Sequence, residues 1–112
     1  MASVRFDALR TVAFGSITGS YTALGTPTTK NMRLIKIVNT TDADMFISFD
    51  GTTDNDIIPA GGFTLYDFAT NAPATASSSW FVLAIATQIY VKYSTAPTLG
   101  AVWVVGIYST GV

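Results

Sequence analysis

The chain has 112 residues, of which 49% are apolar and only 12% are charged, about half the charged share of an average globular protein. Six basic residues and seven aspartates give a net charge of −1, and glutamate, histidine and cysteine are absent. A chain so close to neutral has no field that would attract nucleic acid or an anionic membrane, so we expect neither partner. The missing residue types are those most used for acid–base and nucleophilic catalysis, so we expect no enzyme and no cofactor.

The length fits one domain, so we expect residues 1–112 to form a single domain with one core. The N-terminal residues lack the apolar run of a secretory signal, and the longest apolar runs have the length of strands rather than of transmembrane helices. We therefore expect a chain made in the cytoplasm without a signal peptide. Its positive mean hydropathy predicts that a partner covers part of its apolar surface, although a monomer coated with threonine and serine is the alternative.

The first third of the chain contains no helical stripe. Residues 9–16 are predicted to form an edge strand, in which Arg10 would discourage pairing with another chain. Residues 21–24 should be short and extended. A loop is predicted at 25–29, because Pro27 has no amide hydrogen for a strand ladder.

The clearest strand covers residues 33–39, which are β-branched and almost continuously apolar. This composition is typical of a central strand that is covered on both sides. Turn-forming asparagine and aspartate side chains follow at 39–44, and a second strand is expected at 45–50. The two strands and their turn are predicted to form a β-hairpin.

The middle of the chain alternates turns and short strands. A turn is expected at 50–55, a short apolar pair at 57–58 and a chain reversal at 59–62. A strand should follow at 63–68. The serine- and alanine-rich residues 71–79 are predicted to form an exposed loop.

Three strands are expected in the last third, at 80–86, 89–93 and 101–108, with a loop at 94–100. Short strands at this spacing, with no helix, predict an all-β fold. The expected architecture is an antiparallel β-sandwich or jelly-roll-like barrel of about seven or eight strands.

Five aspartates cluster in the predicted turns: Asp42, Asp44, Asp50, Asp54 and Asp56. Their spacing does not fit a calcium-binding EF-hand, so we interpret them as turn-forming side chains and expect no metal site, with a calcium site as the alternative. Two aspartates across a cleft could hydrolyse a glycoside, but nothing in the sequence sets one carboxyl group apart from another. No catalytic residue is predicted.

Aromatic side chains could fill the core, bind a partner or stack on sugars. Trp80 is the preferred exposed anchor, because it follows the serine-rich loop. The candidate protein interface consists of Trp80, Tyr66, Phe68, Trp103 and Tyr108.

Three segments resemble small all-β virion structural proteins of tailed bacteriophages: residues 39–51, 58–67 and 89–97. The resemblance implies a component of the virion, either a capsid decoration (cement) protein or an accessory subunit of the neck or tail, and it implies no catalytic residues. Of these positions we favour capsid decoration.

The partners implied are copies of the chain itself, as a homo-oligomer such as a trimer, and other virion proteins such as the major capsid protein. A closed oligomer would also remove exposed strand edges. A carbohydrate- or receptor-binding module of a virion fibre is the second interpretation, and a small hydrolase is the third.

Overall fold

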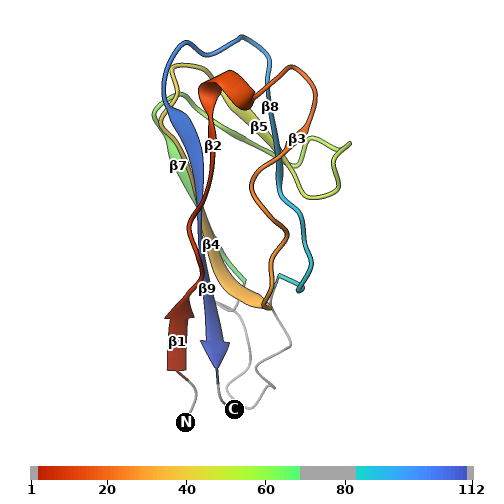
Figure 1. The fold of residues 1–112 in the computed structure, drawn as a ribbon, viewed down its shortest axis with the longest axis vertical. Coiled ribbons are helices and arrows are strands. Elements are labelled where there is room, and N and C mark those ends of the chain that lie inside the picture. The colour runs from red at the N-terminus through yellow and green to blue at the C-terminus, as the bar shows by residue number, and fades with distance from the viewer. Residues whose placement is uncertain (1–2, 69–82, 111–112) are drawn as a thin grey trace.

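The computed structural model describes residues 3–68 and 83–110, which form two antiparallel sheets (Figure 1). The first sheet contains β1 (Ser3–Phe6), β2 (Arg10–Ala13), β4 (Met32–Asn39), β7 (Phe63–Asp67) and β9 (Ala101–Thr110). The second sheet contains β3 (Thr22–Ala23), β5 (Met45–Ser48), β6 (Asp56–Ile58) and β8 (Tyr90–Tyr93). A single turn of 3₁₀ helix, η1 (Phe14–Ser16), follows β2.

The long strand β9 organises the first sheet, whose order is β1-β9-β4-β7. β1 pairs with one end of β9, from Ile107 to Thr110, and β2 pairs with the other end, from Ala101 to Val104. The second sheet has the order β3-β8-β5-β6. These two sheets confirm the predicted antiparallel β-sandwich.

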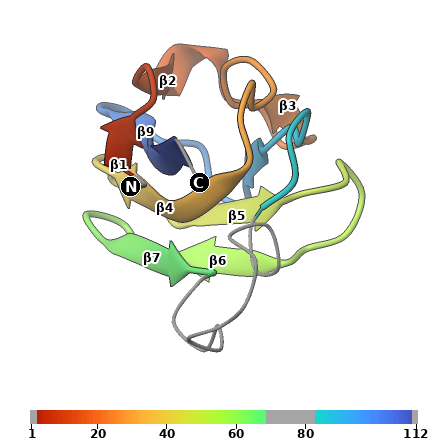
Figure 2. The same ribbon diagram turned by 90° about the horizontal axis from the view of Figure 1, so that it is seen from below.

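The core lies between the sheets (Figure 2). The first sheet contributes inward side chains from alternate positions of β4 and β9, and the second sheet contributes those of β5, β6 and β8. The side chains with no exposed surface include Ile35, Ile37, Val102, Val104, Met45, Ile47, Ile58 and Val91. This alternation is the sequence pattern expected of strands with one buried face.

The predicted hairpin of residues 33–50 is wrong. β4 and β5 belong to different sheets, and β5 pairs instead with β6, with Met45 opposite Ile58. The turn between β4 and β5 crosses from the first sheet to the second, and the connection between β6 and β7 crosses back. The buried Asn39 joins these two crossovers. The side-chain amide of Asn39 donates to the carbonyl oxygens of Ala43, Ile58 and Pro59.

β4 is central, with β9 and β7 on its two edges, but its two faces are not both covered as predicted. Ile35 and Ile37 have no exposed surface, whereas Leu34, Lys36 and Val38 on the other face are partly exposed. The continuous apolar sequence of β4 therefore does not mean that both of its faces are buried. One face fills the core and the other belongs to the surface of the sandwich.

The predicted role of Arg10, to discourage pairing of an exposed strand edge with another chain, is wrong, because its side chain is buried. The predicted strand at 9–16 ends at Ala13, where the 3₁₀ turn begins, and the preceding strand β1 was not predicted. Further along, Leu83 makes a single bridge with Met32, and the chain then turns instead of continuing the strand predicted at 80–86. Residues 80–82 and the predicted loop 71–79 lie outside the described residues.

Other expected elements are confirmed. The extended segment at 21–24 contains β3, and the strands at 63–68, 89–93 and 101–108 correspond to β7, β8 and β9. The turn at 50–55 joins β5 to β6.

Candidate functional site

The surface of the first sheet that faces away from the core is largely apolar. Opposed residues of antiparallel strands point to the same side of a sheet, so the strand register defines this surface. We call it the outer face. Three of its rows across the sheet are Phe6–Ile107–Leu34–Asp67, Val105–Lys36–Leu65 and Thr11–Trp103–Val38–Phe63.

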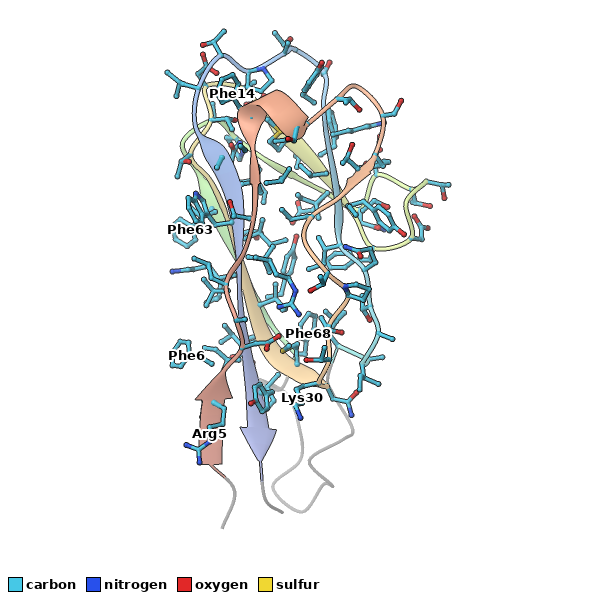
Figure 3. All side chains as sticks on the ribbon, viewed as in Figure 1. Arg5, Phe6, Phe14, Lys30, Phe63 and Phe68 are labelled. Atoms are coloured by element: carbon cyan, nitrogen blue, oxygen red, sulfur yellow. The ribbon has the colours of Figure 1, made fainter. Side chains whose placement is uncertain are left out.

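The most exposed side chains of the outer face are at the two edges of the sheet. Phe6 on β1 is 71% exposed, and Phe63 and Leu65 on β7 are 66% and 52% exposed. Figure 3 shows Phe6 and Phe63 projecting from the same flank of the ribbon. The charged residues of these three rows are one lysine, Lys36, and one aspartate, Asp67.

Of the residues predicted for the interface, Trp103 lies on the outer face, between Thr11 and Val38. Tyr66, Phe68 and Tyr108 are partly buried and pack against the core cluster instead. Trp80 lies outside the described residues. The structure therefore brings Trp103 together with a different set of apolar residues.

Phe6, Phe63 and Leu65 are surface residues that were not predicted as part of the interface. Alternation in β7 was visible, with Phe63, Leu65 and Asp67 on one side and Thr64 and Tyr66 on the other. The aspartate was the signal that the first of these sides faces solvent.

Tyr66 has a structural role between the sheets. Its ring stacks on Phe68 with the centroids 6.2 Å apart, and its hydroxyl donates to the carboxylate of Asp56. The pKa of Tyr66 is raised well above its usual value, mainly by burial and secondly by the hydrogen bond to Asp56. The hydroxyl therefore keeps its proton and joins β7 to β6.

The clustered aspartates act within turns. Asp50 accepts hydrogen bonds from the amides of Thr52 and Thr53 at 2.9 and 2.7 Å. These bonds hold the pKa of Asp50 far below its usual value, with the Thr53 amide as the largest cause and the Thr52 amide as the second. Asp42 accepts from the amide of Thr98, and Asp44 accepts from that of Ala60. Within residues 3–68 and 83–110, no three carboxylates come together in a way that would hold a metal ion.

The second sheet carries a surface pocket of about 430 Å³. Its lining combines two aromatic residues, one lysine, one aspartate, one serine and one glycine: Phe46, Tyr93, Lys92, Asp54, Ser94 and Gly19. Phe46 and Lys92 are directly opposed on β5 and β8, and Asp54 comes from the turn between β5 and β6.

Lys92 is the centre of the polar contacts at this pocket. Its Nζ lies 3.3 Å from Oδ1 of Asp54, 4.6 Å from the centroid of the Tyr21 ring and 5.8 Å from that of Phe46. The hydroxyl of Tyr21 donates to Asp54, and this hydrogen bond is the main cause that lowers the pKa of Asp54. Burial and the same bond raise the pKa of Tyr21, so at neutral pH the carboxylate is ionised and the phenol is neutral.

No protein-family model and no curated protein matches the chain. Among solved structures, the Dit protein (gp 19.1) of phage SPP1, described as a paradigm of the hub adsorption apparatus in phages that infect Gram-positive bacteria, is 16% identical with a TM-score of 0.41. The similarity covers 96% of this chain and 49% of that protein, so the chain spans about half its length. A similarity of this size does not establish a function, so the function is inferred from the residues of this chain.

In the described residues no helix is long and apolar enough to cross a membrane.

Proposed function

We propose that the chain is a non-enzymatic structural subunit of a tailed-phage virion, and that it packs onto neighbouring subunits through the outer face of its first sheet. The observation that supports this is the exposure of Phe6, Phe63 and Leu65 in three rows of the outer face whose residues are apolar apart from Thr11, Lys36 and Asp67. Isolated apolar residues are normal on a protein surface, but a contiguous apolar patch marks a contact site.

The outer face is large enough to form part of a protein–protein interface. Four strands at about 4.8 Å spacing and three rows of side chains at about 6.8 Å give a surface of roughly 400 Å². That is within the range of the largest patches found on monomers, which are often functional. A standard interface uses about 800 Å² on each partner, so adjoining loops would supply the remainder.

The occupant that we propose for the outer face is a second copy of the chain. Lys36 and Asp67 give this surface one charge of each sign, so two copies would meet without net repulsion. The proposed oligomer is closed, as a trimer or ring would be, and it attaches to the major capsid protein. We propose capsid decoration as its position in the particle, with a neck or tail adaptor as the second candidate.

Sedimentation velocity of the purified chain tests the assembly. We expect the wild type to form one defined oligomer at about 100 μM, within reach of interfaces of micromolar affinity. The substitution Phe63→Lys should convert it to a folded monomer. Ile57→Lys is the matched control, because Ile57 is also exposed but lies on β6 of the other sheet.

A wild type that stays monomeric, or a Phe63→Lys variant that assembles as well as the control, would count against the outer face as the contact surface. A density map of particles carrying the chain would then separate the positions. Density on the capsid lattice supports decoration, density at the neck or tail supports an adaptor, and its absence from the particle contradicts the virion role.

A further inference from the structure

The pocket on the second sheet has a lining that the assembly role does not use. It lies on the surface of β5 and β8 that faces away from the core, because the opposed residues Phe46 and Lys92 alternate with the buried Met45, Ile47 and Val91. The outer face belongs to the other sheet. A ligand in this pocket would therefore leave the outer face accessible.

The charges at the pocket favour a neutral ligand. The ammonium group of Lys92 and the carboxylate of Asp54 are 3.3 Å apart and cancel each other. An anion or a cation would have to compete with this ion pair for one of its members. A ligand with adjacent hydroxyl groups would not, because it can accept from Lys92 and donate to Asp54 at the same time.

The two charged groups are also held in place. Tyr21 donates to Asp54 and lies with its ring 4.6 Å below the lysine nitrogen, so both partners of the ion pair have a further contact. Holding these groups reduces the entropy that a ligand would otherwise have to remove on binding. Ser94, which is exposed and lines the same pocket, offers a hydroxyl as a third polar group.

The aromatic part of the lining suits the apolar C–H groups of a sugar ring. Tyr93 lies opposite the buried Met45 and packs against the core cluster, whereas Phe46 is partly exposed on the same side of the sheet as Lys92 and lines the pocket. The C–H groups of a pyranose pack on such rings while its hydroxyls remain on the polar side. The volume of about 430 Å³ is at the lower end of the range for small-molecule sites, which suits one sugar ring.

We propose that this pocket binds a neutral hexopyranose unit, with the hydroxyls held by Lys92, Asp54 and Ser94 and the ring packed against Phe46. The site adds sugar binding to a structural subunit. It requires no metal and no bond-making step.

Amide chemical shifts of the ¹⁵N-labelled chain test the proposal. The probes are glucose, galactose, mannose, N-acetylglucosamine and N-acetylgalactosamine, each added to about 50 mM, well above the millimolar dissociation constant that so small a ligand should have. We expect at least one sugar to shift the amides of Gly19, Lys92 and Ser94 in a saturable way.

Substitutions then assign the contacts. Asp54→Asn and Lys92→Met should each weaken binding at least tenfold. Asp44→Asn and Lys30→Met are the matched controls, because they make the same chemical changes at residues that do not line the pocket. Amide spectra of all four variants report that the fold is kept.

The proposal is overturned if no sugar of the panel shifts the pocket amides, or if the shifts appear elsewhere on the molecule. It is also overturned if Asp54→Asn and Lys92→Met bind as tightly as the controls. Since the assembly test uses Phe63 on the other sheet, either proposal can fail without the other.

Discussion

The guanidinium of Arg10 donates from Nη1 to Oδ2 of Asp7 across 2.8 Å, at the point where the chain passes from β1 to β2. The same side chain donates from Nε to the carbonyl oxygen of Thr26 and from Nη2 to that of Pro27. Arg10 is only 7% exposed. A residue that would suit a solvent-exposed strand edge instead connects the N-terminal segment to the loop after β3.

We therefore expect Arg10→Met to destabilise the fold by about 2–4 kcal/mol. Methionine keeps part of the apolar volume but leaves three carbonyl oxygens, those of Ala8, Thr26 and Pro27, and a carboxylate without their donor. Urea denaturation measures the change. Arg5→Met is the control, because Arg5 is exposed on β1, and its effect should stay within about 0.5 kcal/mol. Equal midpoints for the two variants would show that the buried contacts of Arg10 contribute nothing.

The pH dependence of stability should report Asp7. Burial raises the pKa of this carboxyl, but the hydrogen bond from Arg10, with smaller contributions from the Ala8 amide and from charge, lowers it further, and the net shift is downward. A folded-state pKa below the unfolded value of about 3.9 contributes stability that is present above that pH. This stability is lost as the pH falls through the folded-state pKa.

The measurement is the difference in unfolding free energy between the wild type and Asp7→Asn. It should be constant from about pH 7 to pH 5 and should shrink below about pH 4, where Asp7 takes up a proton. Taking the difference removes the contributions of other carboxyls such as Asp50. A difference that grows on acidification would contradict the direction of the shift.

Two glycines form a matched pair for testing backbone constraint. Gly100 and Gly61 both have positive φ, of 87° and 72°. A Cβ at Gly100 would lie 2.2 Å from the carbonyl oxygen of Thr40, whereas a Cβ at Gly61 meets no atom within 4 Å. Gly61→Ala should cost about 1–2 kcal/mol, the price of a left-handed conformation alone.

Gly100→Ala should cost more than about 4 kcal/mol, since the clash adds to the same backbone strain. Thr40 cannot easily move away, because its amide and hydroxyl both donate to the carbonyl oxygen of Ala101. Thermal unfolding of the two variants side by side provides the comparison. Similar melting temperatures would mean that the loop holding Thr40 shifts freely.

Local features of the fold could be predicted from the sequence, and pairing between distant strands could not. The apolar alternation of residues 89–93 and the continuous apolar run at 101–108 located β8 and β9 correctly. The turn at 39–44 was also visible in its composition, but a turn does not state whether the next strand returns to the same sheet. That choice depends on Asn39, whose partners Ile58 and Pro59 are about twenty residues further along the chain.

The candidate surfaces could be predicted only in part, for a related reason. Trp103 is a candidate from the sequence as an aromatic residue in a predicted strand, and its neighbours Val38 and Phe63 follow only from the register of β9, β4 and β7. The pocket depends on contacts of Lys92 with Tyr21 and Asp54, from three separate segments. Composition does not show such a meeting of segments.

Asn39 should be essential for the crossover between the sheets. It has no exposed surface, its amide nitrogen has three carbonyl acceptors, and its Oδ1 accepts from the amide and hydroxyl of Thr41. Asn39→Asp keeps the shape and the acceptor but removes the donor and buries a charge, so we expect a loss of at least about 3 kcal/mol. Denaturant unfolding checks this. A stable Asn39→Asp variant would show that the three donated hydrogen bonds are dispensable.

Adjacent residues of β4 separate folding from assembly. Ile37 has no exposed surface and points into the core, whereas Val38 points to the outer face beside Trp103 and Phe63. Ile37→Asp should prevent folding, because an unpaired carboxylate would be buried at a cost above about 4 kcal/mol. Val38→Asp should fold with a loss of only about 1–2 kcal/mol, as expected for aspartate in a strand, because water still reaches this position.

Circular dichroism and sedimentation velocity on the two variants provide the readouts. Val38→Asp should show the β spectrum of the wild type and sediment as a monomer, because an added charge between Trp103 and Phe63 opposes burial of the outer face against a second copy. An unfolded Val38→Asp would mean that this side chain belongs to the core. A folded variant that assembles like the wild type would place the contact between subunits somewhere other than the outer face.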